Sequence, residues 1–150
     1  MKVKKVISDW RRIREGLIDT IEKFTEDELT YKPYDTCYSV GQTMLHIAHE
    51  EFGEIQYGLS KELHEFPPAY ELDEYPTIGS IKDLLTDVHT QTEMYLNSLE
   101  DQDLEDEFEA QWGETRPLID FIFHVMEHEI HHRGELSLII GLLGREGLDA

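Results

Sequence analysis

The chain has 150 residues, of which 39% are hydrophobic, and its 13 basic and 33 acidic side chains leave a formal net charge of −20. No compositional break divides it, so we expect a single domain over residues 1–150 with a sizeable core. So negative a surface repels phosphate backbones and anionic lipids, which makes nucleic acid and membranes poor partners. The single cysteine, Cys37, excludes an internal disulfide, and we see no apolar stretch of signal-peptide or transmembrane length. We therefore expect a cytoplasmic protein.

Apolar residues recur at steps of three and four near the start of the chain, which predicts an amphipathic helix over roughly residues 4–24. These residues are Ile7, Trp10, Ile13, Leu17, Ile21 and Phe24. Thr25-Glu-Asp-Glu28 then has the form of a capping box. It predicts one further helical turn before Pro33 stops the helix.

A second helix is predicted from about residue 40 to 62, because Ser39-Val-Gly-Gln42 has the form of a capping box and an apolar stripe follows it. His46 and His49 lie near its beginning. Cys37 precedes the helix, and we interpret it as a small buried residue rather than a thiolate stabilised by the helix dipole. The prolines of residues 63–77 predict an ordered, non-helical connection, long enough to run the length of a bundle.

A third helix is predicted from the cap-like Ser80-Ile-Lys-Asp83 to about residue 99, with His89 on its surface. The acidic run over residues 100–107 predicts a solvated connection. Phe108, Trp112 and the turn residue Gly113 predict a segment that packs back onto the helices.

A fourth helix is predicted from about Pro117 to Leu143. Four amphipathic helices without a strand-rich region predict an all-α fold. We expect an antiparallel four-helix bundle with a long crossover between helices two and three.

The predicted fourth helix contains four of the eight histidines within nine consecutive positions. His128 and His132 are four residues apart and share one face, so their imidazoles can reach one ion from adjacent turns. His124 and His131 lie near the same stripe, and we expect them to line or support the site. The alternative is a polar seam facing solvent. Core-type residues around the cluster favour a metal site: Ile119, Ile122, Val125, Met126, Leu136, Ile139 and Ile140.

Two ligands on one helix leave the coordination of an ion incomplete, so another element must supply a third. We select His46, because neighbouring helices can place His46 at the same height along the bundle as His128 and His132. His49 and Glu50 are the other candidates on the same helix. Three neutral histidines with open positions are typical of a catalytic metal site rather than a closed structural one.

The segment Ser39-Val-Gly-Gln-Thr-Met-Leu-His46, followed later by the histidines of the last helix, resembles the DinB family of metal-binding helical bundles over essentially the whole chain. The resemblance implies that His46, His128 and His132 bind a divalent ion. Family members often have Trp before the serine of helix two and Gln after Arg-Gly on the last helix. Here Tyr38 and Glu135 take those positions, and the second change places a carboxylate one turn beyond His132.

The resemblance also implies two kinds of function. The first is a metal-dependent transferase or isomerase acting on a small electrophile with a thiol such as bacillithiol, mycothiol or glutathione. The ion would be Zn, Ni, Mn or Fe, and it would hold the thiol as a thiolate. The second is a metal- or ligand-binding module without turnover. The resemblance further implies a homodimer formed through helix faces.

A rival motif overlaps the same residues, because His128-Glu129-Ile-His131-His132 satisfies the H-E-x-x-H pattern of zinc hydrolases. We favour it less, since few residues follow His132 to supply a downstream ligand and no candidate strand could bind a peptide. Glu129 remains the one candidate catalytic carboxylate, which could orient a water molecule at the ion. A solvated helix carboxylate is the favoured interpretation of this residue.

Overall fold

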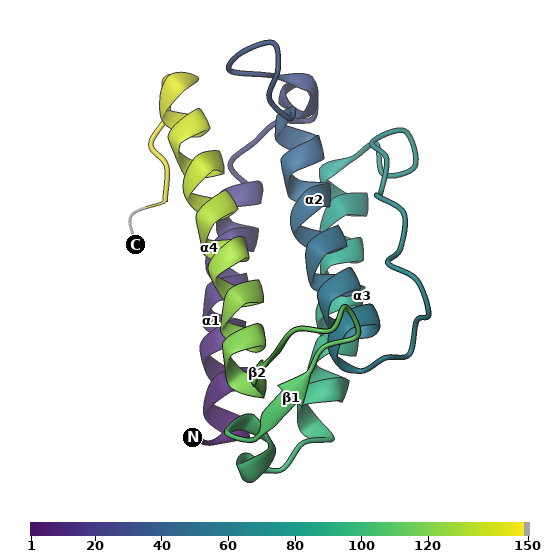
Figure 1. Ribbon diagram of the computed structural model, residues 1–150. Coiled ribbons are helices and arrows are strands. Elements are labelled where there is room, and N and C mark those ends of the chain that lie inside the picture. Colours follow the sequence, from purple (N-terminus) through teal and green to yellow (C-terminus); the bar gives the residue numbers. More distant parts are fainter. Residues whose placement is uncertain (149–150) are drawn as a thin grey trace.

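The computed structural model describes residues 1–148, and this part of the chain forms four long helices with a small two-stranded sheet. The helices are α1 (Val3–Ile21), α2 (Val40–Gly53), α3 (Ile78–Asn97) and α4 (Leu118–Leu142). They lie side by side, with α1 and α4 running in one direction and α2 and α3 in the other (Figure 1). No helix in the described part of the chain is long and apolar enough to cross a membrane.

α1 buries the predicted apolar stripe but ends at Ile21, three residues before the predicted end. The reason is a tighter turn, in which the N–H of Lys23 donates to Thr20 and that of Phe24 to Ile21. The capping box at Thr25 then begins a short 3₁₀ helix, η1 (Glu26–Thr30), as its pattern predicted.

α2 begins at the predicted cap, where the Ser39 hydroxyl accepts a hydrogen bond from the Gln42 N–H and the Gln42 side chain accepts one from the Ser39 N–H. The helix continues into a π-helical turn, η2 (Glu54–Leu59). A Cβ added at Gly58 would lie 2.1 Å from the Trp112 ring, so this glycine allows the indole to pack against the backbone.

Residues 61–77 form the predicted non-helical connection, which returns along the length of the helices before α3 (Figure 1). α3 begins one turn earlier than expected. Thr77 is the N-cap and accepts a hydrogen bond from the Ser80 N–H, so Ser80 is the third helical residue and not the cap.

A hairpin precedes α4, whereas we predicted no strand. β1 (Glu107–Glu109) pairs antiparallel with β2 (Thr115–Pro117), and a 3₁₀ helix, η3 (Asp101–Leu104), lies just before it. Gly113 has φ of +93° in the connecting turn, a conformation that favours glycine. As predicted, this segment packs on the helices: the rings of Phe108 and Trp112 lie 6.2 and 5.8 Å from that of Phe121.

The core consists of two apolar clusters stacked along the helices, one around Trp10 and Phe121 and the other around Leu17 and Met44. Between them every helix contributes buried polar side chains at one level. We call this set the polar layer: Arg14 of α1, Glu51 of α2, His89 and Thr92 of α3, and Glu129 of α4.

Arg14 is the centre of the polar layer. Its guanidinium donates to the carboxylates of both Glu51 and Glu129 and to the Leu85 carbonyl at 2.8 Å. Burial alone would lower the pKa of Arg14, but the charges of the two carboxylates outweigh burial and raise it. One buried cation therefore joins α1 to α2, α3 and α4.

The α3 side chains complete the polar layer around Glu51. His89 Nδ1 lies 2.8 Å from the Glu51 carboxylate, and the Thr92 hydroxyl donates to the same oxygen at 2.7 Å. The prediction that His89 lies on the surface is wrong, since only 8% of it is exposed. The hydrogen bond to Glu51 explains why His89 can be buried, because a buried imidazole needs a hydrogen-bond partner.

Candidate metal centre

Three histidines from two helices converge where α2 faces α4. The Nε2 atom of His128 lies 3.0 Å from Nε2 of His46 and 3.1 Å from Nε2 of His132. Each residue offers a nitrogen within 4.8 Å of those of the other two. These are the three residues that we selected as ligands from the sequence, and the structure brings them together.

The donor set fits a divalent ion. Nε2 of His128 directs either one proton or one lone pair, so it cannot be paired equally well with two neighbouring ring nitrogens. A cation resolves this, because it accepts a lone pair from each imidazole. Tetrahedral coordination with bonds of about 2.0–2.1 Å holds two nitrogens about 3.3 Å apart, close to the separations around His128.

Burial keeps the imidazoles of His46 and His128 neutral, which is the state that binds metal. Burial lowers the pKa of His46 in spite of the opposing charge of Glu50. Burial also lowers the pKa of His128 to about 3, and the neighbouring His132 and His46 add to this effect. Half-buried neutral histidines with converging nitrogens are a ready set of ligands.

Glu135 orients His132 from behind. Its carboxylate lies 2.7 Å from His132 Nδ1, the ring nitrogen that does not face the other histidines. A carboxylate in this position fixes the tautomer and makes Nε2 a stronger donor. The other Glu135 oxygen lies 3.1 Å from Nε2 of the exposed His131, so His131 supports the site through Glu135.

The other candidates on α2 and α4 lie at the edge of the site. His49 Nε2 lies 2.8 Å from the Pro67 carbonyl, which ties this ring to the crossover. Glu50 approaches His46 Nδ1 only to 3.9 Å, although His46, His49 and Glu50 form a second group close enough to hold an ion. His124 is exposed one turn before His128.

Glu129 occupies the polar layer and not the surface. It is 2% exposed, and its carboxylate accepts hydrogen bonds from Arg14 and from the Trp10 indole. The prediction of a solvated carboxylate is therefore wrong. Both oxygens have buried partners on α1, so this side chain is not free to act as the base that the hydrolase motif requires.

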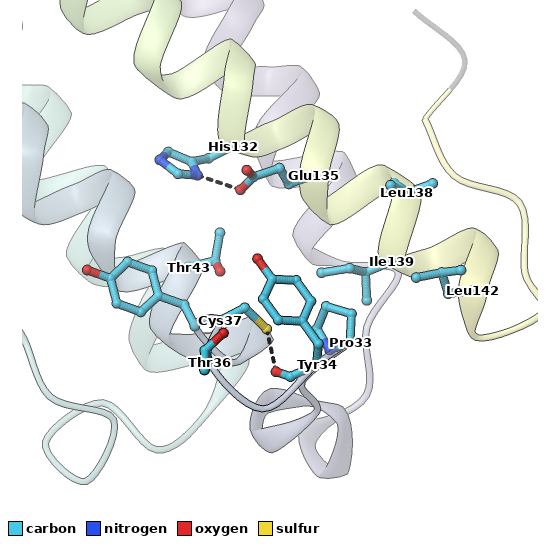
Figure 2. A pocket seen from close by; sticks show the side chains of 11 residues that line it. Pro33, Tyr34, Thr36, Cys37, Thr43, His132, Glu135, Leu138, Ile139 and Leu142 are labelled. Carbon is cyan, nitrogen blue, oxygen red and sulfur yellow. Dashed lines mark hydrogen bonds and ion pairs between the residues drawn. The ribbon is translucent and has the colours of Figure 1, made fainter.

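A cavity of about 750 Å³ opens beside His132. Figure 2 shows that the loop carrying Tyr34 and Cys37 forms one side and that α4, with Glu135 and Leu138, forms the other. Cys37 is half-buried and donates from Sγ to the Tyr34 carbonyl at 3.0 Å. The expectation of a buried cysteine is not met, because the loop turns its thiol toward this cavity.

A smaller cavity of about 210 Å³ lies on the other side of the triad, lined by His46, His49, Glu50 and part of the crossover. Tyr38 lines both cavities, and its ring lies 5.2 Å from that of His46. The histidines therefore stand between two spaces that a small molecule can enter.

Comparison with known proteins agrees with this architecture. The profile of the DinB superfamily matches residues 9–136. A crystal structure of a DinB-like protein from Bacillus cereus has a TM-score of 0.80 and 18% identity over 99% of this chain and 97% of that one. A DinB-like protein from Bacillus subtilis has a TM-score of 0.72 and 21% identity, over 97% of this chain and 96% of its own.

A more distant structure is the mycothiol-dependent maleylpyruvate isomerase, with a TM-score of 0.62 and 10% identity, over 88% of this chain but 60% of the isomerase. Among curated proteins, none matches the sequence. Because the profile covers most of the chain, this protein belongs to the DinB superfamily.

Proposed function

We propose that this protein is a divalent-metal-dependent enzyme that joins a low-molecular-weight thiol to a small electrophile, in the manner of an S-transferase. The observation that carries the proposal is the position of the histidine triad at the edge of a cavity of about 750 Å³. A structural ion is normally closed off by four protein ligands. Here three imidazoles converge beside a space large enough for a substrate.

His46, His128 and His132 hold the ion, and Glu135 fixes the orientation of His132. A divalent ion held there would lower the pKa of a bound thiol and so raise the thiolate fraction at neutral pH. The side chains of Leu138 and Ile139 line the neighbouring cavity and would give the body of the thiol an apolar surface to lie against.

One structural relative supports the proposal that the cosubstrate is a thiol. The isomerase with the same fold is described as mycothiol-dependent, so a thiol cosubstrate is compatible with this arrangement of helices. Because the identity between the two chains is 10%, mycothiol, bacillithiol and glutathione are all candidates for a direct test.

Titration of the Co²⁺-loaded protein with each thiol tests the proposal. A thiolate-to-cobalt absorption band that saturates with thiol, and that is absent from His128→Ala, is the expected result. His64→Ala is the matched control, because His64 is exposed in the crossover. A loaded protein that shows no such band with any of the three thiols would contradict the proposal and favour a metal-binding module without turnover.

A further inference from the structure

The two cavities beside the histidine triad share one electrostatic property. Within the part of the chain that the structure describes, neither is lined by a lysine or an arginine. Glu135 is the acidic residue of the larger cavity, and Glu50 and Glu71 line the smaller one. The chain as a whole carries a formal charge of −20. The electrostatic potential is therefore negative both at the cavities and over the chain as a whole.

The charge at the triad can be counted. Three neutral imidazoles around a divalent ion leave two positive charges, and the Glu135 and Glu50 carboxylates beside His132 and His46 oppose them even before a thiolate binds. A second anionic group on the same ligand would find no basic side chain among the residues that line either cavity. Moving such a group out of water without a partner is unfavourable.

The larger cavity also has an apolar wall. Leu138 and Leu142 of α4 are 66% and 59% exposed, and together with Ile139 they line the side of the cavity shown in Figure 2. Tyr34 stands across from them on the loop and is 64% exposed. Exposed apolar side chains gathered around a cavity are typical of a surface that a ligand covers.

We propose that the ligand of this cavity is uncharged or cationic apart from its thiolate, with an apolar body that lies against Leu138 and Leu142. The inference rests on the proposed function and narrows its substrate class. Anionic electrophiles and thiols that carry additional carboxylates are selected against by the absence of a counter-charge.

Three thiols of matched length test the charge preference: pentanethiol, aminobutanethiol and mercaptopentanoate. The butylene spacer keeps the end group away from the ion. Each is titrated into the Co²⁺-loaded protein and followed by the thiolate-to-cobalt absorption, with a small tris-imidazole cobalt complex as the reference for intrinsic thiolate affinity. Relative to that reference, we expect the carboxylate probe to bind at least about tenfold more weakly than the other two.

Thr36→Lys places a cation in the loop wall of the cavity and should raise affinity for mercaptopentanoate by about tenfold without raising that for aminobutanethiol. Thr36→Gln, which adds length without charge, is the matched control and should leave the order of affinities among the three thiols unchanged. Thr36 is exposed, so neither change threatens the fold. Equal affinity of all three probes for the unmodified protein, or a preference for the carboxylate, would overturn the inference.

A second arm tests the apolar wall by lengthening the alkyl chain from propanethiol to heptanethiol. We expect affinity to rise by up to roughly fourfold per methylene, and Leu138→Ser to reduce that rise. A flat series would overturn the apolar assignment. If none of the thiols produces the absorption band, the proposed function itself has failed, and that outcome is distinct from a band without charge or length preference.

Discussion

Two polar sites connect α2 to α4, and they differ in almost every physical respect. The histidine triad is half-buried, contains no formal charge and opens toward cavities. The polar layer is buried, joins all four helices and holds the carboxylates of Glu51 and Glu129 against the single guanidinium of Arg14. The ring nitrogens of the triad converge and can bind a ligand, whereas in the layer the oxygens of Glu51 and Glu129 all have partners and only His89 Nε2 is buried without one. The first arrangement suits the binding of an ion or small molecule, and the second fixes the distance between the helices that carry the histidines.

Arg14→Leu should give the largest effect, because it leaves two carboxylates buried without their cation. Loss of one partner of a buried ion pair costs about 3–5 kcal/mol. Urea unfolding measures this loss in the free energy of unfolding. The comparison is His128→Ala in metal-free protein, which should cost less than about 1 kcal/mol. Similar costs for the two variants would show that the sites do not differ as described.

Acid should act on the polar layer through Glu51. Burial would raise its pKa, but the charge of Arg14 and hydrogen bonds from His89 and Thr92 lower it to about 2, below the ordinary 4.5. As pH falls from 4.5 to 2, the unfolded chain binds the proton first, so the free energy of unfolding falls across this window, by on the order of 3 kcal/mol. Glu51→Gln should flatten that pH dependence. An unchanged slope would contradict the assignment.

The two sites also differ in how far the sequence reveals them. His128 and His132 could be paired from the sequence, because both lie on one helix and a spacing of four places them on the same face. We did not single out Arg14 from the sequence, although this residue lies on the apolar stripe between Trp10 and Leu17. That position was the available signal.

Glu51, His89 and Glu129 also occupy core-facing positions, so one charged or polar residue on the buried face of each helix could have been noticed. Their partnership could not, since it depends on how four helices align. The hairpin was missed for another reason. Its strands have three residues each, which is too short for an alternation of apolar and polar residues to show, and they follow an acidic run.

The fold itself follows from local signals. Capping residues at Ser39 and the apolar stripes located the helices, and the prolines near residue 67 located the connection between α2 and α3. The end of α1 and the start of α3 were displaced by up to one turn, because 3₁₀ turns and capping boxes shift boundaries without changing the stripe.

Metal should stabilise the triad and leave the polar layer untouched. Binding to the native state alone adds about 2.7 kcal/mol at a hundredfold excess over Kd. Thermal unfolding with and without Zn²⁺ should show this gain in the unmodified chain and in His64→Ala, but not in His128→Ala. We expect the chelated protein to keep its helices, because the apolar clusters and the Arg14 contacts do not involve the triad. Loss of helicity on chelation would indicate a structural ion.

Glu135→Gln should produce the smallest change. It removes the carboxylate that orients His132 while preserving the size of the side chain. Loss of such an orienting partner weakens metal binding by about tenfold or somewhat more, and competition with a chromophoric chelator measures it. Glu127→Gln, on the exposed side of α4 near the site, is the control. Equal metal affinities of the Glu135→Gln and Glu127→Gln variants would show that Glu135 does not contribute to metal binding.

The most direct test of the central claim is the metal content of purified protein after dialysis against Zn²⁺ and then buffer. Elemental analysis should find one ion per chain in the unmodified protein and in His64→Ala. It should find almost none in His46→Ala, His128→Ala or His132→Ala, each with unchanged helicity. Retention of metal by all three variants at the level of the unmodified protein would contradict the three-histidine centre.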